Sequence, residues 1–124
     1  AHAEYDFAVY YAGTISSDVV AWISTQNVEI LMAPDYDPVG LSQFEKVRSV
    51  AKTQLWVPDD IAEMFESHHD KDSLHKQNNR TILLSLLGKT GLDKATLNIV
   101  ELINRYQGCL YQEIFYPVEA ESHT

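Results

Sequence analysis

Cysteine is almost absent from this sequence: Cys109 is the single one among 124 residues. One thiol cannot form an internal disulfide, and it excludes a zinc site built from several cysteines. The chain also lacks any apolar run near the roughly 20 residues that cross a bilayer. No basic region followed by an apolar stretch and a small-residue cleavage site stands at its start. These absences predict a soluble, cytoplasmic protein that makes no membrane contact.

Positive charge is scarce as well. The sequence has 9 Lys and Arg against 18 Asp and Glu, which gives a formal net charge of −9. A domain that holds nucleic acid by general electrostatic attraction needs basic side chains to displace counterions from phosphates. A nucleic-acid role would therefore need a divalent metal at an acidic site, basic surface on another domain, or a partner protein.

What is present fits one folded domain. Hydrophobic residues at 45% and charged residues at 22% are ordinary for a globular chain, so disorder is not indicated. The length predicts a single domain over residues 1–124. Because the chain begins AHAEYDF, without Met and with almost no lead-in before the first apolar run, we expect a C-terminal fragment of a longer protein.

The first half alternates predicted strands and helices. The strands are expected at Phe7–Ala12, Val28–Ala33 and the TQLWVP stretch from Thr53. The first of them is apolar on both faces, which is typical of a parallel sheet. The first helix is capped by Ser16 or Ser17, and the second covers residues 40–52. Inward-facing positions of the first helix are expected at Val19, Val20, Trp22 and Ile23.

The second half is predicted to be mainly helical. Helices are expected at Asp59–Phe65, Asn79–Leu87 and Asp93–Tyr106, with SHHDKDSLHKQNNR as a polar loop after the first. Cys109–Val118 has strand-like composition, and Pro117 limits it to an edge. The fold class expected is therefore α/β: a mostly parallel sheet, helices on both faces, a helical C-terminal half and a last edge strand.

The segment DYDPVG follows the second predicted strand. In extended chain, residues two apart point the same way, so Asp35 and Asp37 can direct both carboxylates into one pocket. Hard oxygen ligands suit Mg²⁺ or Mn²⁺, and ligands of parallel sheets bind beyond the carboxyl ends of the strands. Gly40 would let a phosphate approach the backbone where the next helix begins. The pattern predicts a metal site that faces phosphate.

A simpler interpretation stays open for the same residues. Asp35 can start a turn, Pro38 can stiffen it, and Asp37 can cap the following helix. The strand before the motif, the helix after it, and the fixed positions of Pro38 and Gly40 favour the metal site.

The stretch ILMAPDYDPVGL resembles the metal-binding motif of Toprim domains, the nuclease module of topoisomerases and primases. Its DPxG form, with Leu41 opening a helix, is similar to the branch that contains type IIB topoisomerase A subunits and the nuclease subunit of Wadjet-type anti-plasmid systems. That branch carries a Gln-Glu pair near the end of the domain, and Tyr111-Gln112-Glu113 is similar to it.

The resemblance implies a Rossmann-like Toprim fold and metal-dependent DNA cleavage. Asp35 and Asp37 would ligate Mg²⁺ or Mn²⁺, and Glu113 would lie near them as a further ligand or a structural anchor. The cation would polarise a phosphoryl oxygen for attack by water. The implied partners are DNA, reached through other domains or subunits, and a second copy of the chain or a larger defence complex.

One expected residue is missing. Toprim domains carry a glutamate at the end of an earlier strand, whereas the first strand here ends Ala12-Gly13-Thr14. Either the glutamate-bearing strand lies upstream of Ala1, or the domain is degenerate. The second explanation gives an alternative function, a non-catalytic interaction domain.

Other motifs give weaker hypotheses. Asp35, Asp37 and Val39 also fit the D-x-D-x-[TV] signature of haloacid-dehalogenase-like phosphatases, but that signature usually lies on the first strand. Gly88-Lys89-Thr90 lacks the earlier glycine of a phosphate-binding loop, since Leu83 stands there. Solvated surface is the more frequent explanation for two further sets: His68, His69, Asp70, Asp72 and His75 as a transition-metal site, and Lys46, Arg48 and Lys52 as a nucleic-acid contact.

Overall fold

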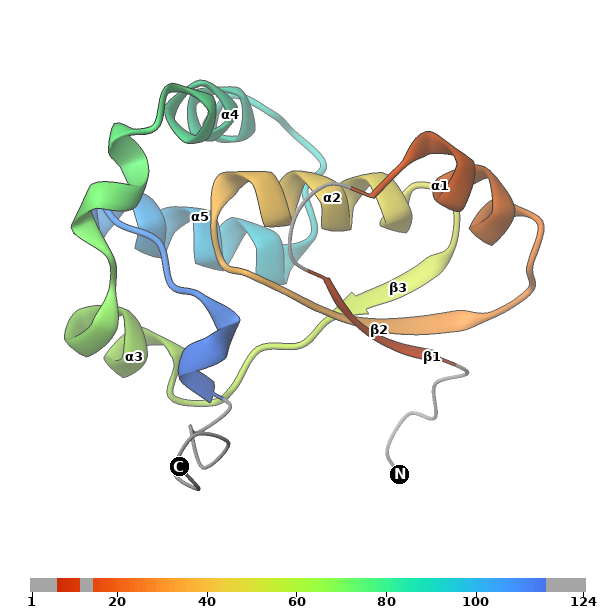
Figure 1. Ribbon diagram of the computed structural model, residues 1–124, viewed down its shortest axis with the longest axis horizontal. Helices are drawn as coiled ribbons and strands as arrows, with labels where there is room; N and C mark the ends of the chain where they lie inside the picture. Colours follow the sequence, from red (N-terminus) through yellow and green to blue (C-terminus); the bar gives the residue numbers. More distant parts are fainter. Residues whose placement is uncertain (1–6, 12–14, 116–124) are drawn as a thin grey trace, which may run out of the picture.

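The computed structural model describes residues 7–11 and 15–115. Within them, strands and helices alternate in the first half and helices dominate the second (Figure 1). The elements are β1 (Phe7–Tyr11), α1 (Ser17–Ser24), β2 (Glu29–Pro34), α2 (Pro38–Arg48), β3 (Lys52–Leu55), α3 (Ile61–His68), η1 (Lys71–His75), α4 (Gln77–Leu87), α5 (Lys94–Tyr106) and η2 (Gln112–Phe115), where η marks a 3-10 helix.

The strands form a parallel sheet in the order β1-β2-β3. Ile30 lies beside Phe7 and Thr53, and Met32 pairs with Leu55. Alternate residues of the central strand β2 are buried, as expected when one face of a sheet packs against a helix. The prediction of an α/β fold with a parallel sheet is confirmed.

Helices on both faces of the sheet are not found among the described residues. Figure 1 shows α1 and α2 on the same side of the strands, and α2 makes the closest contacts with β2 and β3. The strand order explains this arrangement. Two successive crossovers of the same hand, stepping in the same direction across a sheet, place both helices on one face.

Helix α2 connects the sheet to the helical half. Leu41, Phe44 and Val47 recur at helical spacing and are almost fully buried. The helix packs against β2 and β3 on one side and against α4 on another. Its first turn is therefore held firmly next to the end of β2.

Helix α1 differs from its prediction. Ser16 caps it as expected, since its hydroxyl accepts from the amide of Val19 at 3.2 Å. However, Trp22 is 55% exposed and Val19 is 43% exposed, so Ile23 is the inward-facing residue of this helix that is buried. Helical spacing predicted an inward face, but α1 packs chiefly against α2, which covers only a narrow stripe of an eight-residue helix.

The polar segment expected as a loop is partly helical. Helix α3 continues to His68, η1 occupies Lys71–His75, and α4 begins at Gln77. Local capping favours η1, because the Asp70 carboxylate accepts from the amide of Asp72 at 3.0 Å. Helices near the three predicted positions of this half are confirmed. In the described ranges, no helix combines the length and apolar character of a membrane span.

The last edge strand is wrong as far as the structure describes it. Cys109 and Leu110 form single antiparallel bridges with Asp70 and Tyr36, and Gln112–Phe115 is a 3-10 helix. Pairing stops because the amide of Gln112 donates to a side chain, the Asp35 carboxylate, in place of a strand carbonyl. Residues 116–118 of the prediction lie outside the described residues.

Candidate functional site

Asp35 and Asp37 occupy the turn between β2 and α2. Asp37 is the N-cap of α2, and its Oδ1 accepts from the amide of Gly40 at 2.7 Å. Pro38 begins the helix, where its missing N–H costs nothing. The capping interpretation is therefore confirmed for Asp37. It is compatible with a metal site, because a carboxylate has a second oxygen and spare lone pairs on the first.

Gly40 is required by a close approach of two backbone segments. A Cβ at this position would lie 2.2 Å from the carbonyl oxygen of Asp35 and 3.0 Å from Asp37 Oδ1. No side chain fits there without moving the aspartate turn. The first turn of α2 thus packs directly against Asp35, a constraint that holds whether or not Gly40 also faces a phosphate.

The chain from Cys109 onward completes the site. Tyr36 and Leu110 exchange backbone hydrogen bonds at 2.8 and 3.1 Å. The amide of Gln112 then donates to Asp35 Oδ1 at 2.7 Å, and its side-chain Nε2 donates to the Pro34 carbonyl at 2.7 Å. The two sequence features that carry the family resemblance are therefore in contact, although Asp35 and Gln112 are 77 positions apart.

Of the Gln112-Glu113 pair, Gln112 is the residue that anchors the chain to the DYDPVG turn. Its side chain is fully buried, whereas Glu113 is exposed and influences Asp35 through its charge. Across residues 7–11 and 15–115, no group of three or more His, Cys, Asp or Glu side chains could hold a metal ion. The structure thus assembles a pair of aspartates and leaves Glu113 beside the pair.

Replacing Gln112 with Ala is expected to lower the free energy of unfolding by about 2 kcal/mol, because it leaves a cavity and an unpaired Pro34 carbonyl. Glu113→Ala, next to it on the exposed side, should change stability by less than about 0.5 kcal/mol. Urea denaturation of the two variants checks this. Equal stability of both would contradict the anchoring role of Gln112.

Both aspartates lie in surroundings that disfavour negative charge. Burial raises the pKa of Asp37 to about 6; the Gly40 amide and the Lys76 charge oppose this rise, and the Asp35 charge adds to it. Burial also raises the pKa of Asp35, against the hydrogen bond from Gln112 and with the charge of Glu113. Two poorly solvated carboxylates of like charge favour a bound cation.

The carboxylates open into a pocket of about 230 Å³. One wall is the turn and first residues of α2, and another is the beginning of α4. The lining residues are Asp35, Asp37, Val39, Gly40, Lys76, Asn78, Asn79 and Tyr111. Sequence reasoning missed the α4 wall, because the KQNNR run was assigned to a loop and no spacing links it to Asp35.

Asn79 and Tyr111 have restricted roles in this pocket. The Asn79 side chain is buried and donates to the Ser73 carbonyl at 2.9 Å, which fixes the start of α4. Burial raises the pKa of Tyr111 to about 12, so its phenol is neutral at physiological pH. Burial also raises the pKa of Cys109 to about 12, and this fully buried thiol is inert.

The other candidate residues are not brought together into a site. His69 Nδ1 bonds to the Phe65 carbonyl at 2.6 Å, and its ring lies against Tyr106. His75 lies 4.0 Å from Asp72 as an exposed pair. Gly88-Lys89-Thr90 follows a helix, whereas a phosphate-binding loop lies between a strand and a helix.

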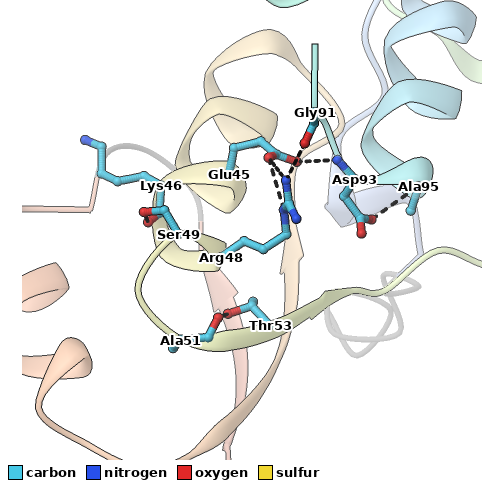
Figure 2. Close-up of polar contacts among 9 residues, drawn as sticks. All are labelled: Glu45, Lys46, Arg48, Ser49, Ala51, Thr53, Gly91, Asp93 and Ala95. Carbon is cyan, nitrogen blue, oxygen red and sulfur yellow. Dashed lines mark hydrogen bonds and ion pairs between the residues drawn. The ribbon is translucent and has the colours of Figure 1, made fainter. Parts of the chain in front are cut away.

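Arg48 is a structural residue in this fold. Figure 2 shows its guanidinium between the Glu45 carboxylate, at 2.7 Å, and the Gly91 carbonyl, at 2.9 Å. Glu45 also accepts from the amide of Asp93 at 3.3 Å, so α2 is tied to the turn before α5. Lys52 lies 3.4 Å from Glu29. A basic surface made of Lys46, Arg48 and Lys52 is therefore not assembled.

Comparison of the chain with protein-family models, with curated proteins and with solved structures gives no match. The Toprim resemblance accordingly stays a prediction from the residues themselves.

Proposed function

We propose that this chain is the metal-binding part of a Toprim-like nuclease, in which Asp35 and Asp37 hold Mg²⁺ or Mn²⁺ for cleavage of DNA phosphodiesters. The observation that supports this most is the 2.7 Å hydrogen bond from the Gln112 amide to Asp35. It joins the DYDPVG turn and the Gln112-Glu113 pair, the two features on which the resemblance rests. A DNA-processing or plasmid-defence protein is the setting that the resemblance implies.

The chemistry of the two donors fits a small divalent cation. Mg²⁺ prefers hard oxygen ligands and is commonly bound by one or two carboxylates, with water and substrate phosphate completing its shell. When bound, it polarises a phosphoryl oxygen and lowers the pKa of a coordinated water. The Gln112 amide orients Asp35, and the Gly40 amide orients Asp37, so the chain presents both carboxylates in fixed positions.

The test is cation binding followed by cleavage. Titration calorimetry with Mn²⁺ should give heat with the wild-type chain and none with Asp35→Ala plus Asp37→Ala. The same double change should abolish cleavage of supercoiled plasmid in Mn²⁺. Full cleavage by the double variant would refute the proposal.

A degenerate, non-catalytic Toprim-like domain is the second candidate. It is favoured by one observation, namely that the described residues offer a pair of carboxylates without a third metal-binding side chain beside them. This candidate predicts a folded chain that gives no heat with Mn²⁺ or Mg²⁺. Calorimetry thus separates the two functions before any nuclease assay.

A further inference from the structure

We infer that Lys76 is a catalytic residue of this pocket, which contacts the phosphate of the substrate beside the cation held by Asp35 and Asp37. This inference rests on the proposed function and adds a residue to it. Neither the DYDPVG motif nor the Gln112-Glu113 pair contains a basic residue, so the inference comes from the fold alone.

The fold places Lys76 in the wall of the pocket that the beginning of α4 forms. It immediately precedes α4, and it lines the same 230 Å³ pocket as Asp35, Asp37 and Gly40. Its charge acts on Asp37, yet within the described residues no ion pair shorter than 4.0 Å fixes its ammonium group. Lys76 is exposed, so its ammonium can reach a ligand in the pocket.

The beginning of α4 adds backbone donors on the same side. Lys76 stands at the N-cap position, where Ser, Thr, Asp or Asn would normally satisfy an amide of the first turn, and no side-chain cap is formed. Amides at the start of an eleven-residue helix favour negative charge. The first turn of α2 borders the same pocket. An anion there would meet an ammonium group and helix amides together.

The test compares Lys76→Gln with Lys89→Gln, which removes the same charge from the exposed connection after α4. Lys76→Gln should lower plasmid cleavage in Mn²⁺ about 100- to 1,000-fold, as expected for loss of one donor to a transition-state oxyanion. Its Mn²⁺ affinity should be unchanged or higher, because a neighbouring positive charge is removed. Lys76→Arg should recover part of the rate, and Lys89→Gln should match the wild type.

A binding measurement covers the case in which cleavage is not detected. Dimethyl phosphate, a phosphodiester probe, is titrated into the ¹⁵N-labelled chain that is already saturated with Mg²⁺, and further shifts are expected at the amides of residues 40 and 77–79. These shifts should persist in Lys89→Gln and disappear in Lys76→Gln.

The outcomes separate the two proposals. Wild-type cleavage and probe binding by Lys76→Gln, with Mn²⁺ binding still lost in Asp37→Ala, would overturn the inference and leave the proposed function standing. Absence of Mn²⁺ heat in the wild type would overturn the proposed function. Absence of probe shifts in the wild type would overturn the inference by itself.

Discussion

Replacing Asp37 with Asn is expected to raise the free energy of unfolding at pH 7 by up to about 3 kcal/mol while it abolishes cation binding. The pKa of Asp37 is raised from 3.8 to about 6, and each unit corresponds to about 1.4 kcal/mol. Asn keeps the cap, because its amide oxygen can accept from Gly40 as Asp37 Oδ1 does at 2.7 Å. The variant would therefore lose only the unfavourable charge.

The extra stability of Asp37→Asn over the wild type should increase as the pH rises. Because the folded-state pKa of Asp37 lies above the unfolded value, the folded wild type binds more protons between about pH 4 and pH 6. This contribution to wild-type stability is fully present below the unfolded pKa and is lost as the pH rises through about 6. Asp37→Asn should thus match the wild type near pH 3.5 and exceed it near pH 7.

Divalent cation should reverse the order of the two proteins. Mn²⁺ at about 1,000 times its dissociation constant stabilises a folded protein by about 4.1 kcal/mol, and only the wild type should respond. Urea denaturation at several pH values, with and without Mn²⁺, measures both effects. Asp93→Asn is the matched control, because Asp93 also caps a helix, accepting from Ala95 at 3.1 Å, and lies outside the pocket. The same gain at every pH, or in Asp93→Asn, would contradict the explanation.

The turn around Asp37 was predictable because its signals are local. An apolar run ends at Pro34, Asp37 caps the next helix, and Pro38 occupies the first helical position. Each of these features is encoded within a few residues, so sequence spacing is sufficient to place both aspartates after a strand. The helix cap and the proposed cation site use the same Asp37 carboxylate, so the two interpretations of the motif are compatible.

The far wall of the pocket was not predictable, because it depends on long-range contacts. Lys76 and Asn79 reach the aspartates through the packing of α4 against α2 and through single bridges at Tyr36 and Asp70. A bridge between two single residues, unlike a strand, leaves no alternating hydrophobic pattern in the sequence. Cys109–Val118 has strand-like composition for a different reason: in its described part, Phe115 packs edge-on against the rings of Tyr36 and Trp56.

Trp22 shows a limit of helical periodicity. Spacing indicates which residues of a helix share a face, but it does not show whether another element covers that face. In the described fold α2 covers a stripe that includes Ile23, and Trp22 remains 55% exposed. Local propensity therefore predicted the helix and a serine cap at Ser16 or Ser17, of which Ser16 forms it, whereas burial was decided by the arrangement of neighbouring elements.

Replacing Gly40 with Ala is expected to lower the free energy of unfolding by about 3 kcal/mol, the upper end of ordinary overpacking costs. The new Cβ would lie 2.2 Å from the carbonyl oxygen of Asp35, a backbone atom that cannot rotate away. Either the first turn of α2 or the aspartate turn has to move. Because Gly40 also donates to Asp37 at 2.7 Å, such a movement displaces both proposed cation ligands.

Gly88→Ala is the control for the loss of a glycine as such. A Cβ at Gly88 would meet nothing closer than 3.7 Å, and the residue has right-handed backbone angles at the end of α4. This change should be neutral or stabilising by about 0.5 kcal/mol, since Ala restricts the unfolded chain.

Thermal unfolding and Mn²⁺ calorimetry on both variants give the comparison. Gly40→Ala should be less stable and should bind Mn²⁺ at least about tenfold more weakly. A loss of about 1.4 kcal/mol in binding free energy, caused by misplaced ligands, is enough for that factor. If Gly40→Ala were as stable as Gly88→Ala, the turn would be free to shift, and the fixed spacing of Asp35 and Asp37 could no longer support a cation site.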